Sequence, residues 1–478
     1  MIFTDINYAT LLSLTFLMCL VARKIIARNL ILLIVSYIFY GWWDWRFLSL
    51  IILSSSIDYF AALIIDGRFP WRPRWVSRRL ALSISILANL GILGAFKYLN
   101  FFIDSAVIAL SIFNVTIEPS FLSIILPIGI SFYTFQSMSY SIDVYRGRQR
   151  AETNPINFFL FVSFFPQLVA GPIERASNLL SQINKSKRIT YFNIRAGIEL
   201  IAFGLFKKMV IADNLARVVE HAFNGSDTGF LTLLIGVYAF AFQIYCDFSG
   251  YTDIARGSAK LLGFDLRLNF NVPYFSANPR DFWRRWHMSL SDWIRDYVYI
   301  PLGGRTQKWD RTTINLLLTM ALCGLWHGAA WNFVLWGIYH GILLVLSPNS
   351  RDPKGRRGSV QPFRITWDLK QVLGIFITFH LVCIGWFIFR VEGMEHLVAV
   401  TTGIWTLSFL SGFEVSHIIM LGVLTCPLIC LEVWFSLSNR RDLRGFGEIT
   451  RWGIYASLIY VAIIGQPADQ APFIYFQF

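Results

Sequence analysis

The stretch "RTTINLLLTMALCGLWHGAAWNFVLWGIYHGILLVL" (311–346) contains two apolar runs that meet at a short segment rich in glycine and alanine. A helix needs about 20 mostly apolar residues to cross the hydrocarbon core of a bilayer. His327 lies where the two runs meet, and an ionisable side chain at membrane depth is costly, so it marks a functional site by default. The stretch therefore predicts two membrane helices and makes His327 a candidate site residue.

The rest of the chain repeats this apolar pattern. Of its 478 residues, 55% are hydrophobic and only 15% are charged, whereas a soluble domain carries about 25% charged residues. Apolar runs recur from 7–22 to 452–466 and predict about ten to thirteen membrane passes. We therefore expect an all-α polytopic membrane protein in which residues 1–478 form a single membrane-embedded domain.

Basic residues gather in short runs between the apolar stretches. The net charge is +13, and Lys and Arg cluster in "GRFPWRPRWVSRR" (67–79) and "RDPKGRR" (351–357). An excess of positive charge in cytoplasmic loops is typical of membrane proteins. This arrangement places loop 348–370 in the cytoplasm, before the C-terminal helices. Because no soluble module could carry the charge to a nucleic acid, we expect no nucleic-acid partner.

Residues 265–311 do not have the composition of a membrane span. In "SANPRDFWRRWHMSLSDWIRDYVY" (276–299), Trp283, Trp286 and Trp293 fall on one helix face, and His287 lies beside it. The pattern predicts an amphipathic helix in an interfacial or re-entrant segment. Two roles remain open for it: a cytoplasmic surface helix anchored by its tryptophans, or a binding or catalytic element.

A second segment, "FFPQLVAGPIERASNLLSQI" (164–183), interrupts an apolar run with Pro166 and a Gly-Pro pair. Such a run forms no regular helix. Broken backbone at membrane depth is tolerated only where protein or water covers it. We therefore expect a re-entrant loop that lines a cavity, with Gln167 in it.

A third segment, "YCDFSGYTDIARG" (245–257), places Asp247 and Asp253 directly after an apolar run. Two carboxylates six residues apart lie on different faces of a helix, so an acid/base dyad is not expected. Asp247 is instead predicted to hydrogen-bond a broken helix or to pair with an Arg or His.

Taken together, the motifs resemble the membrane-bound O-acyltransferases. The resemblance rests on these three segments, on "RNLILLIVSYIFYGWWDWRFLSL" (28–50), "LPIGISFYTFQSMSYSIDVYRG" (126–147) and the terminal "FIYFQF", and most specifically on "RRWHMSLSDW" (284–293) combined with "GLWHG" (324–328). The most similar branch is that of the AlgI-type alginate O-acetyltransferases, and the D-alanine exporter DltB is a more distant relative.

The resemblance implies a ring of tilted helices, in which a funnel and a cytoplasmic cavity meet near His327. His287 matches the second functional histidine of the family. The implied activity takes an acetyl group from a cytoplasmic donor for O-acetylation of a polysaccharide outside the cell. Acetyl-CoA is the expected co-substrate, with no bound cofactor. An extracytoplasmic acetyltransferase partner and a location in the bacterial cytoplasmic (inner) membrane are also implied. Gln167 stands where some alginate acetylases carry His, which leaves its role and the identity of the polysaccharide open.

Acyl transfer to a hydroxyl needs a base, and neutral imidazole is the usual one. His327 is accordingly predicted to act as general base or as acyl acceptor, two routes that the sequence does not distinguish. His287 is predicted to be catalytic or to position the donor. Basic residues near it would meet the donor's phosphates or, equally simply, lipid headgroups. The predicted substrate- or donor-binding residues are Arg284, Arg285, Trp286, Trp326, Asn332, Asp247 and Gln167. No metal site is expected, because no carboxylate–histidine spacing suggests one.

Two other functional classes remain as alternatives. A transporter or flippase for a polar solute would also be polytopic, although no inverted repeat is visible. A non-catalytic scaffold for a polysaccharide synthase complex would tolerate the loss of His327 or His287, and both are present. Neither alternative accounts for two motif histidines as directly as acyl transfer does.

Overall fold

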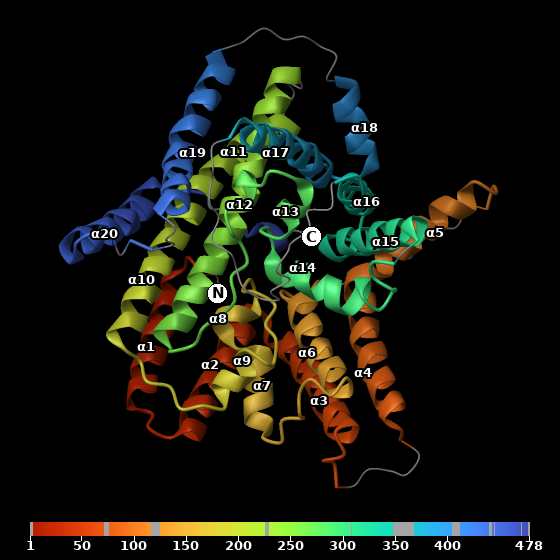
Figure 1. Cartoon of the computed structure of the whole chain (residues 1–478), viewed down its shortest axis with the longest axis vertical. Helices are drawn as coiled ribbons and strands as arrows, with labels where there is room; N and C mark the ends of the chain where they lie inside the picture. The colour runs from red at the N-terminus through yellow and green to blue at the C-terminus, as the bar shows by residue number, and fades with distance from the viewer. Residues whose placement is uncertain are drawn as a thin grey trace. The chain divides into compact units, whose positions relative to one another are not determined.

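The computed structural model describes residues 3–70, 76–115, 125–224, 229–306, 308–347, 368–403, 412–438, 442–443, 445–469 and 471–476 (Figure 1). Within these ranges every regular element is helical, as the sequence predicts. Most of the predicted cytoplasmic loop 348–370 lies outside the described residues, and a helix begins at Leu369, near the predicted end of the loop.

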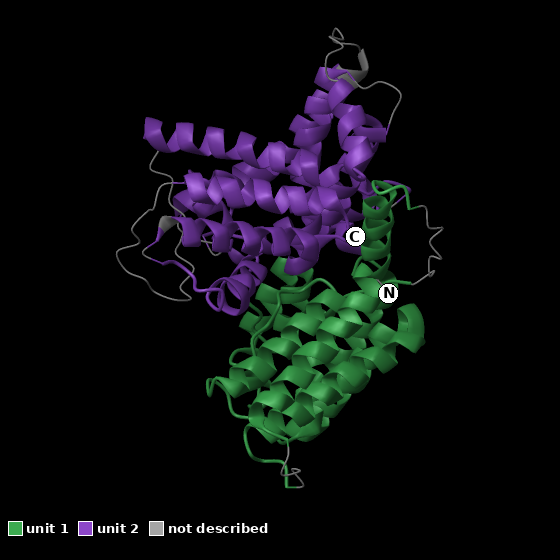
Figure 2. Cartoon of the chain, turned by 90° about the vertical axis from the view of Figure 1, so that its right-hand side faces the viewer, with its two compact units in different colours: residues 1–201, 254–267 green, residues 202–253, 268–478 purple. Residues whose placement is uncertain are grey.

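The helices divide into two compact units (Figure 2), residues 1–201 with 254–267 and residues 202–253 with 268–478. The expectation of one membrane-embedded domain stays a prediction. The first unit contains α1 (Ile6–Val21), α2 (Ile25–Asp44), η1 (Trp45–Phe47), α3 (Leu48–Ile65), α4 (Arg78–Leu93), η2 (Gly94–Tyr98), α5 (Leu99–Ser111), α6 (Ile130–Tyr145), α7 (Pro155–Ser163), α8 (Phe165–Leu168), α9 (Leu179–Ile183) and most of α10 (Tyr191–Leu205).

The second unit carries the remaining elements. These are η3 (Phe206–Ala212), α11 (Asp213–Asn224), most of α12 (Phe230–Leu261), η4 (Pro273–Phe275), α13 (Pro279–Trp283), α14 (Met288–Ile294), η5 (Arg295–Tyr299), α15 (Trp309–His327), α16 (Trp331–Leu346), α17 (Leu369–Arg390), α18 (Met394–Gly403), α19 (Gly412–Ser438), α20 (Glu448–Gly465) and η6 (Ile474–Phe476). The last residues of α12, from Ile254 onward, belong to the first unit.

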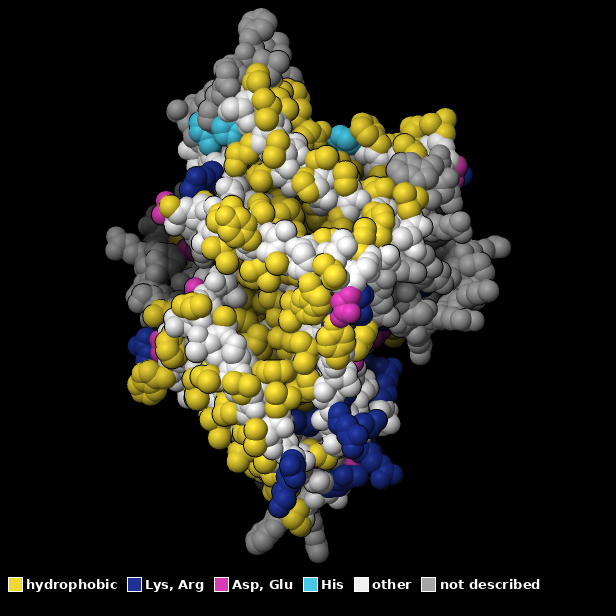
Figure 3. Space-filling view, turned by 90° about the vertical axis from the view of Figure 1, so that its left-hand side faces the viewer, with side chains coloured by type: hydrophobic (Ala, Val, Ile, Leu, Met, Phe, Trp, Pro, Cys, Tyr) yellow, Lys and Arg dark blue, Asp and Glu magenta, His cyan; other side chains and the backbone are white. Residues whose placement is uncertain are grey.

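Several helices are apolar all round, which is typical of membrane spans. On α2, Leu32, Val35 and Phe39 are buried while Ile34 and Ile38 are exposed. Apolar side chains likewise cover much of the face in Figure 3, and Lys and Arg side chains gather toward one end of it. Among the described residues, five helical segments are long and apolar enough to span a membrane: Ile25–Ile65, Arg78–Ser111, Phe230–Leu261, Leu369–Arg390 and Val415–Ser438. The polytopic membrane class is thereby confirmed, whereas the count of ten to thirteen passes and the ring around a funnel stay predictions.

Local sequence explains where the helices begin. Asn154 and Asn278 each accept a hydrogen bond from a backbone N–H of the first turn, at 3.0 and 2.9 Å, and each is followed by a proline. Asn is a favoured N-cap, and proline suits the first helical position because its missing N–H would have no partner there. These caps define the starts of α7 and α13.

The predicted break in 164–183 is confirmed. Helix α7 ends at Ser163, one turn of α8 follows, and the chain then runs without regular structure to α9. Gln167 lies in α8 and donates through Nε2 to the side-chain oxygen of Gln136. That same oxygen accepts from the backbone N–H of Glu174 at 3.3 Å. The Gln136 amide thus provides a hydrogen-bond acceptor for a backbone N–H of the segment that follows α8. The cavity expected beside this segment stays a prediction.

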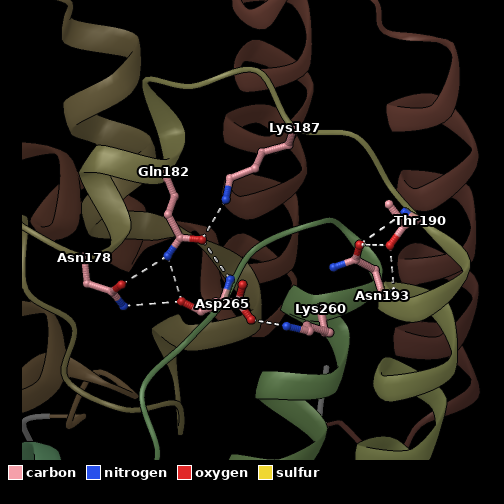
Figure 4. Close-up of polar contacts among 7 residues, drawn as sticks. All are labelled: Asn178, Gln182, Lys187, Thr190, Asn193, Lys260 and Asp265. Atoms are coloured by element: carbon pink, nitrogen blue, oxygen red, sulfur yellow. Dashed lines mark hydrogen bonds and ion pairs between the residues drawn. The ribbon is translucent and has the colours of Figure 1, made fainter. Parts of the chain in front are cut away.

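The end of α12 is held in the first unit by the polar network of Figure 4. The Gln182 amide accepts from the backbone N–H of Asp265 at 2.9 Å and donates to its carbonyl at 2.8 Å. Lys187 donates to Gln182 at 3.1 Å, and Lys260 pairs with the Asp265 carboxylate. These bonds explain why residues 254–267 group with the N-terminal helices.

Candidate active site

His327 is the last residue of α15, as the two apolar runs predict. Its position is set by close packing between α15 and α16. A Cβ atom at Gly324 would lie 2.0 Å from the carbonyl oxygen of Phe333, and one at Gly337 would lie 2.1 Å from that of Met320. Only glycine allows backbones to approach so closely. The glycines of "GLWHG" and "WG" therefore fix the end of the helix that carries His327.

His287 is positioned differently. The prediction of one amphipathic helix in 276–299 is wrong, because α13 ends at Trp283 and α14 begins at Met288. His287 lies between them with a φ of +39°, in the left-handed region that is rare for residues other than glycine. Such a conformation costs about 1–3 kcal/mol and persists only where the surroundings enforce it.

Hydrogen bonds to Asn269 and Asn271 supply that enforcement. The backbone N–H groups of Met288 and Ser289 donate to the carbonyl and to the side-chain oxygen of Asn269, at 2.9 and 3.2 Å. The N–H of Asn271 donates to the carbonyl of Arg285 at 3.0 Å. These bonds compete with the helical pattern and turn the chain at His287, which the hydrophobic spacing alone could not reveal.

The two histidines meet inside the second unit. Their ring centroids lie 6.4 Å apart, and the side chains are 0% and 3% exposed. The Trp326 ring lies 5.9 Å from that of His287 and 5.0 Å from that of His327. Tyr475 approaches from the C-terminal segment, at 6.2 and 5.6 Å from the same two rings. Two buried imidazoles, a buried indole and the partly exposed phenol of Tyr475 thus form one cluster, which we call the histidine site.

Aromatic side chains surround the histidine site. Phe248 contacts His287 edge-on at 4.6 Å, while Trp336 and Phe389 lie 5.0 and 5.5 Å from His327. Burial lowers the pKa of His287 to about 3, because an apolar surround disfavours the charged imidazolium. His287 is therefore a neutral imidazole at physiological pH.

The other residues predicted near His287 differ in exposure. The tryptophans of this segment do not anchor a surface helix, since Trp286 is 1% exposed and packs 4.8 Å from Trp386 in the core. Arg285 pairs with Asp281 at 2.9 Å and is partly buried. Arg284 is exposed and stays the more accessible candidate for an anionic group.

Asn332 and Asp247 both have partners in the second unit. The Asn332 amide donates to the carbonyl of Val391 at 2.8 Å, so this donor already serves the backbone. Asp247 pairs with Lys208 at 2.8 Å and accepts from the N–H of Ile474 at 2.7 Å. The prediction of an Arg or His partner for Asp247, or of a broken helix around it, is wrong, because α12 continues through it.

Gln167 belongs to the first unit, within the amide cluster described above. Its part in substrate binding stays a prediction, as do the roles of the other predicted site residues.

Sequence reasoning missed two residues of the second unit. Tyr475 lies in the terminal "FIYFQF", a motif that supported the family resemblance but from which no site residue was predicted. His340 is fully buried, and its ring lies 4.9 Å from that of Trp336. The same indole contacts His327. A recurring aromatic motif at the end of the chain was the available signal for Tyr475, and helix periodicity gave none for His340.

The fold and this cluster define a polytopic membrane protein with two buried imidazoles in one site, an arrangement suited to acyl transfer. Comparison with known proteins supports that class. The model of the membrane-bound O-acyltransferase family matches residues 147–351, a range that includes both histidines.

Relatives extend the match beyond this range. A probable alginate O-acetylase AlgI of Azotobacter vinelandii is 40% identical over 400 residues, covering 82% of this chain and 76% of the relative. A peptidoglycan O-acetyltransferase of Helicobacter pylori is 35% identical over 426 residues, covering 83% and 77%. A teichoic acid D-alanyltransferase of Bacillus subtilis is 30% identical over 286 residues, covering 56% and 70%. The chain belongs to the membrane-bound O-acyltransferase family, and it is an acyltransferase.

Proposed function

We propose that this protein is an O-acetyltransferase of the bacterial cytoplasmic membrane. It takes an acetyl group from acetyl-CoA on the cytoplasmic side for O-acetylation of a polysaccharide outside, completed with an extracytoplasmic acetyltransferase partner. Relatives named for O-acetylation of alginate and of peptidoglycan support the acetyl group and the polysaccharide class. The observation that carries the proposal is the pair of buried imidazoles in contact with Trp326 and Tyr475.

His327 performs the chemistry by one of two routes. As a base, its imidazole takes the proton of the attacking hydroxyl while the new C–O bond forms and the C–S bond of the thioester breaks, and it then returns the proton to the thiolate. As an acyl acceptor, its nitrogen forms a bond to the acetyl carbon while the C–S bond breaks and a thiolate leaves. The hydroxyl then attacks the acetyl carbon, the C–N bond breaks, and the hydroxyl proton goes to the thiolate. The surrounding aromatic rings keep water away from either intermediate.

His287 acts as a neutral partner in this site. Its lowered pKa keeps it uncharged, so it orients a reacting group by hydrogen bonding rather than by positive charge. Trp326 contacts both imidazoles, and we assign the oxyanion donor to its N–H rather than to Asn332, whose amide is bound to the backbone. Removing one such donor costs about 3 kcal/mol of transition-state stabilisation where it has been measured.

The proposal is tested with purified protein in nanodiscs and acetyl-CoA labelled on its acetyl carbon. Thioester cleavage and protein-bound label are followed for the wild type and for His327→Ala. Loss of general base catalysis predicts a rate lower by about 10²–10⁴-fold in the variant. Label retained on the wild type but absent from the variant would support the acyl-acceptor route.

The matched control is His221→Ala, since His221 stacks on His417 rather than on the histidine site. This variant should cleave the thioester at the wild-type rate. Equal cleavage by wild type and His327→Ala, with folding intact, would contradict the proposed role of His327. No cleavage even when the extracytoplasmic partner and acceptor are supplied would favour the transporter alternative.

A further inference from the structure

The C-terminal segment 471–476 reaches the histidine site although its regular structure is a single 3₁₀ turn. Within it, Phe473 packs 4.2 Å from Tyr251, and Tyr475 packs 4.4 Å from Phe248. Tyr475 contacts both histidines from this position. A turn of three residues provides little stability of its own, so other parts of the unit must hold the segment in place.

Lys208 makes a polar connection to this segment. Its ammonium nitrogen lies 2.7 Å from Asp213, 2.8 Å from Asp247 and 2.9 Å from the carbonyl oxygen of Ala471. A lysine ammonium has three N–H donors, and these three acceptors match them. The three charged side chains are at most 3% exposed, so in the docked state they depend on one another and on the segment rather than on bulk water.

Asp247 makes a second connection. One carboxylate oxygen pairs with Lys208, and the other accepts the backbone N–H of Ile474 at 2.7 Å. The cluster holds one positive and two negative charges, and the N–H from the C-terminal segment helps to offset the excess. Buried charges are tolerated only when they are paired and fully hydrogen-bonded. The docked segment supplies an acceptor to Lys208 and a donor to Asp247, and these two side chains in turn hold the segment by its backbone.

We propose that Lys208 and Asp247 are positioning residues, which latch the C-terminal segment by its backbone so that Tyr475 closes the histidine site. The latch does not touch the substrate. It acts through the position of the segment. Because its bonds go to the backbone of Ala471 and Ile474, they do not depend on the side chains of these two residues. The kinetic part of the test rests on the proposed function, because it measures acetyl transfer. The hydrogen-exchange part does not.

The neighbouring pair Lys207–Asp253 provides a matched control. It joins the same two helical elements, η3 and α12, with the same N···O distance of 2.8 Å. The contacts that hold the backbone of the C-terminal segment come from Lys208 and Asp247 instead. Loss of the control pair should weaken the packing of η3 on α12 without releasing the segment.

The experiment measures amide hydrogen exchange of the C-terminal peptide in the full-length protein in nanodiscs. We expect Asp247→Ala and Lys208→Met to exchange the amides of 473–476 at least tenfold faster than the wild type, and Asp253→Ala to match the wild type. Asp247→Asn keeps an oxygen for the N–H of Ile474 and should give an intermediate rate. This variant also preserves side-chain shape, so it keeps the test usable if the alanine variant does not fold.

The kinetic readout separates positioning from general stability. Asp247→Ala and Lys208→Met should lower kcat for acetyl transfer at least tenfold, with KM for acetyl-CoA within twofold of the wild type. Equal exchange in Asp247→Ala and Asp253→Ala would overturn the latch. Faster exchange with unchanged kcat would overturn its positioning role. Faster exchange in a protein whose wild type transfers no acetyl group would support the latch and contradict the proposed function, so the two failures are distinguishable.

Discussion

The two histidines are brought together by different means. His327 ends a helix of 19 residues, and its place follows from the close packing of α15 on α16. His287 lies in a strained turn between helices of five and seven residues, held by hydrogen bonds to Asn269. One imidazole is placed by packing, and the other is placed by backbone strain that neighbouring bonds maintain.

This difference explains which histidine could be located from the sequence. The apolar runs on both sides of His327 predicted two helices that meet near it, and in the structure α15 ends at His327. The tryptophan spacing around His287 predicted one amphipathic helix, but hydrogen bonds to Asn269, which lies 20 positions before Ser289, break it. Long-range bonds of this kind leave no periodic signal.

The largest effect should follow from Gly324→Ala, which disturbs the packing of α15 on α16 that positions His327. The new Cβ would lie 2.0 Å from the carbonyl oxygen of Phe333 and would force α15 and α16 apart. We expect the free energy of unfolding to fall by about 3 kcal/mol, as overpacking a close contact does, and acetyl transfer to fall with it. Chemical denaturation in detergent measures the first and thioester cleavage the second.

Gly422→Ala is the control for this substitution. Gly422 lies inside α19, and a Cβ atom at this position would have no neighbouring atom within 4 Å. Alanine there should stabilise the helix by up to about 1 kcal/mol. If both variants are as stable as the wild type, close packing does not determine the position of His327.

A smaller effect is expected from Asn269→Ala, which removes a hydrogen bond that maintains the strained turn at His287. The side chain is fully buried, and its oxygen accepts the N–H of Ser289. Leaving that donor without a partner should cost about 2 kcal/mol, and the turn at His287 should relax toward a regular helix. Acetyl transfer is then expected to fall about tenfold, while Asn269→Asp, which keeps the oxygen, should retain more activity. Wild-type transfer by Asn269→Ala would contradict the role given to this bond.

The smallest effect concerns pH. Because burial lowers the pKa of His287 to about 3, only the unfolded chain binds a proton at this position as pH falls below 6.5. The unfolded state is thereby stabilised, so stability should fall by about 1.4 kcal/mol between about pH 7.5 and 5.5. His287→Asn should remove this part of the dependence, as unfolding curves at the two pH values would reveal. An unchanged dependence in the variant would place the titration elsewhere.

Beyond the histidines, the sequence predicted the helical membrane class and the break at Pro166, since apolar runs and proline act locally. It did not predict the partner of Asp247. The carboxylate pairs with Lys208, on the helical element that precedes α11, and with the backbone of Ile474 near the end of the chain. Ion pairs and main-chain bonds between distant segments depend on the packing of whole helices, so spacing within one motif cannot identify them.

The central claim is that His287 and His327 act as one site. A double-mutant cycle tests it most directly, with single-turnover acetyl transfer measured for the wild type, His287→Ala, His327→Ala and the double variant. Residues that act as a unit are strongly non-additive. We therefore expect the double variant to be within a few-fold of His327→Ala alone. If the two losses multiply instead, the histidines act independently and the claim of a single site is wrong.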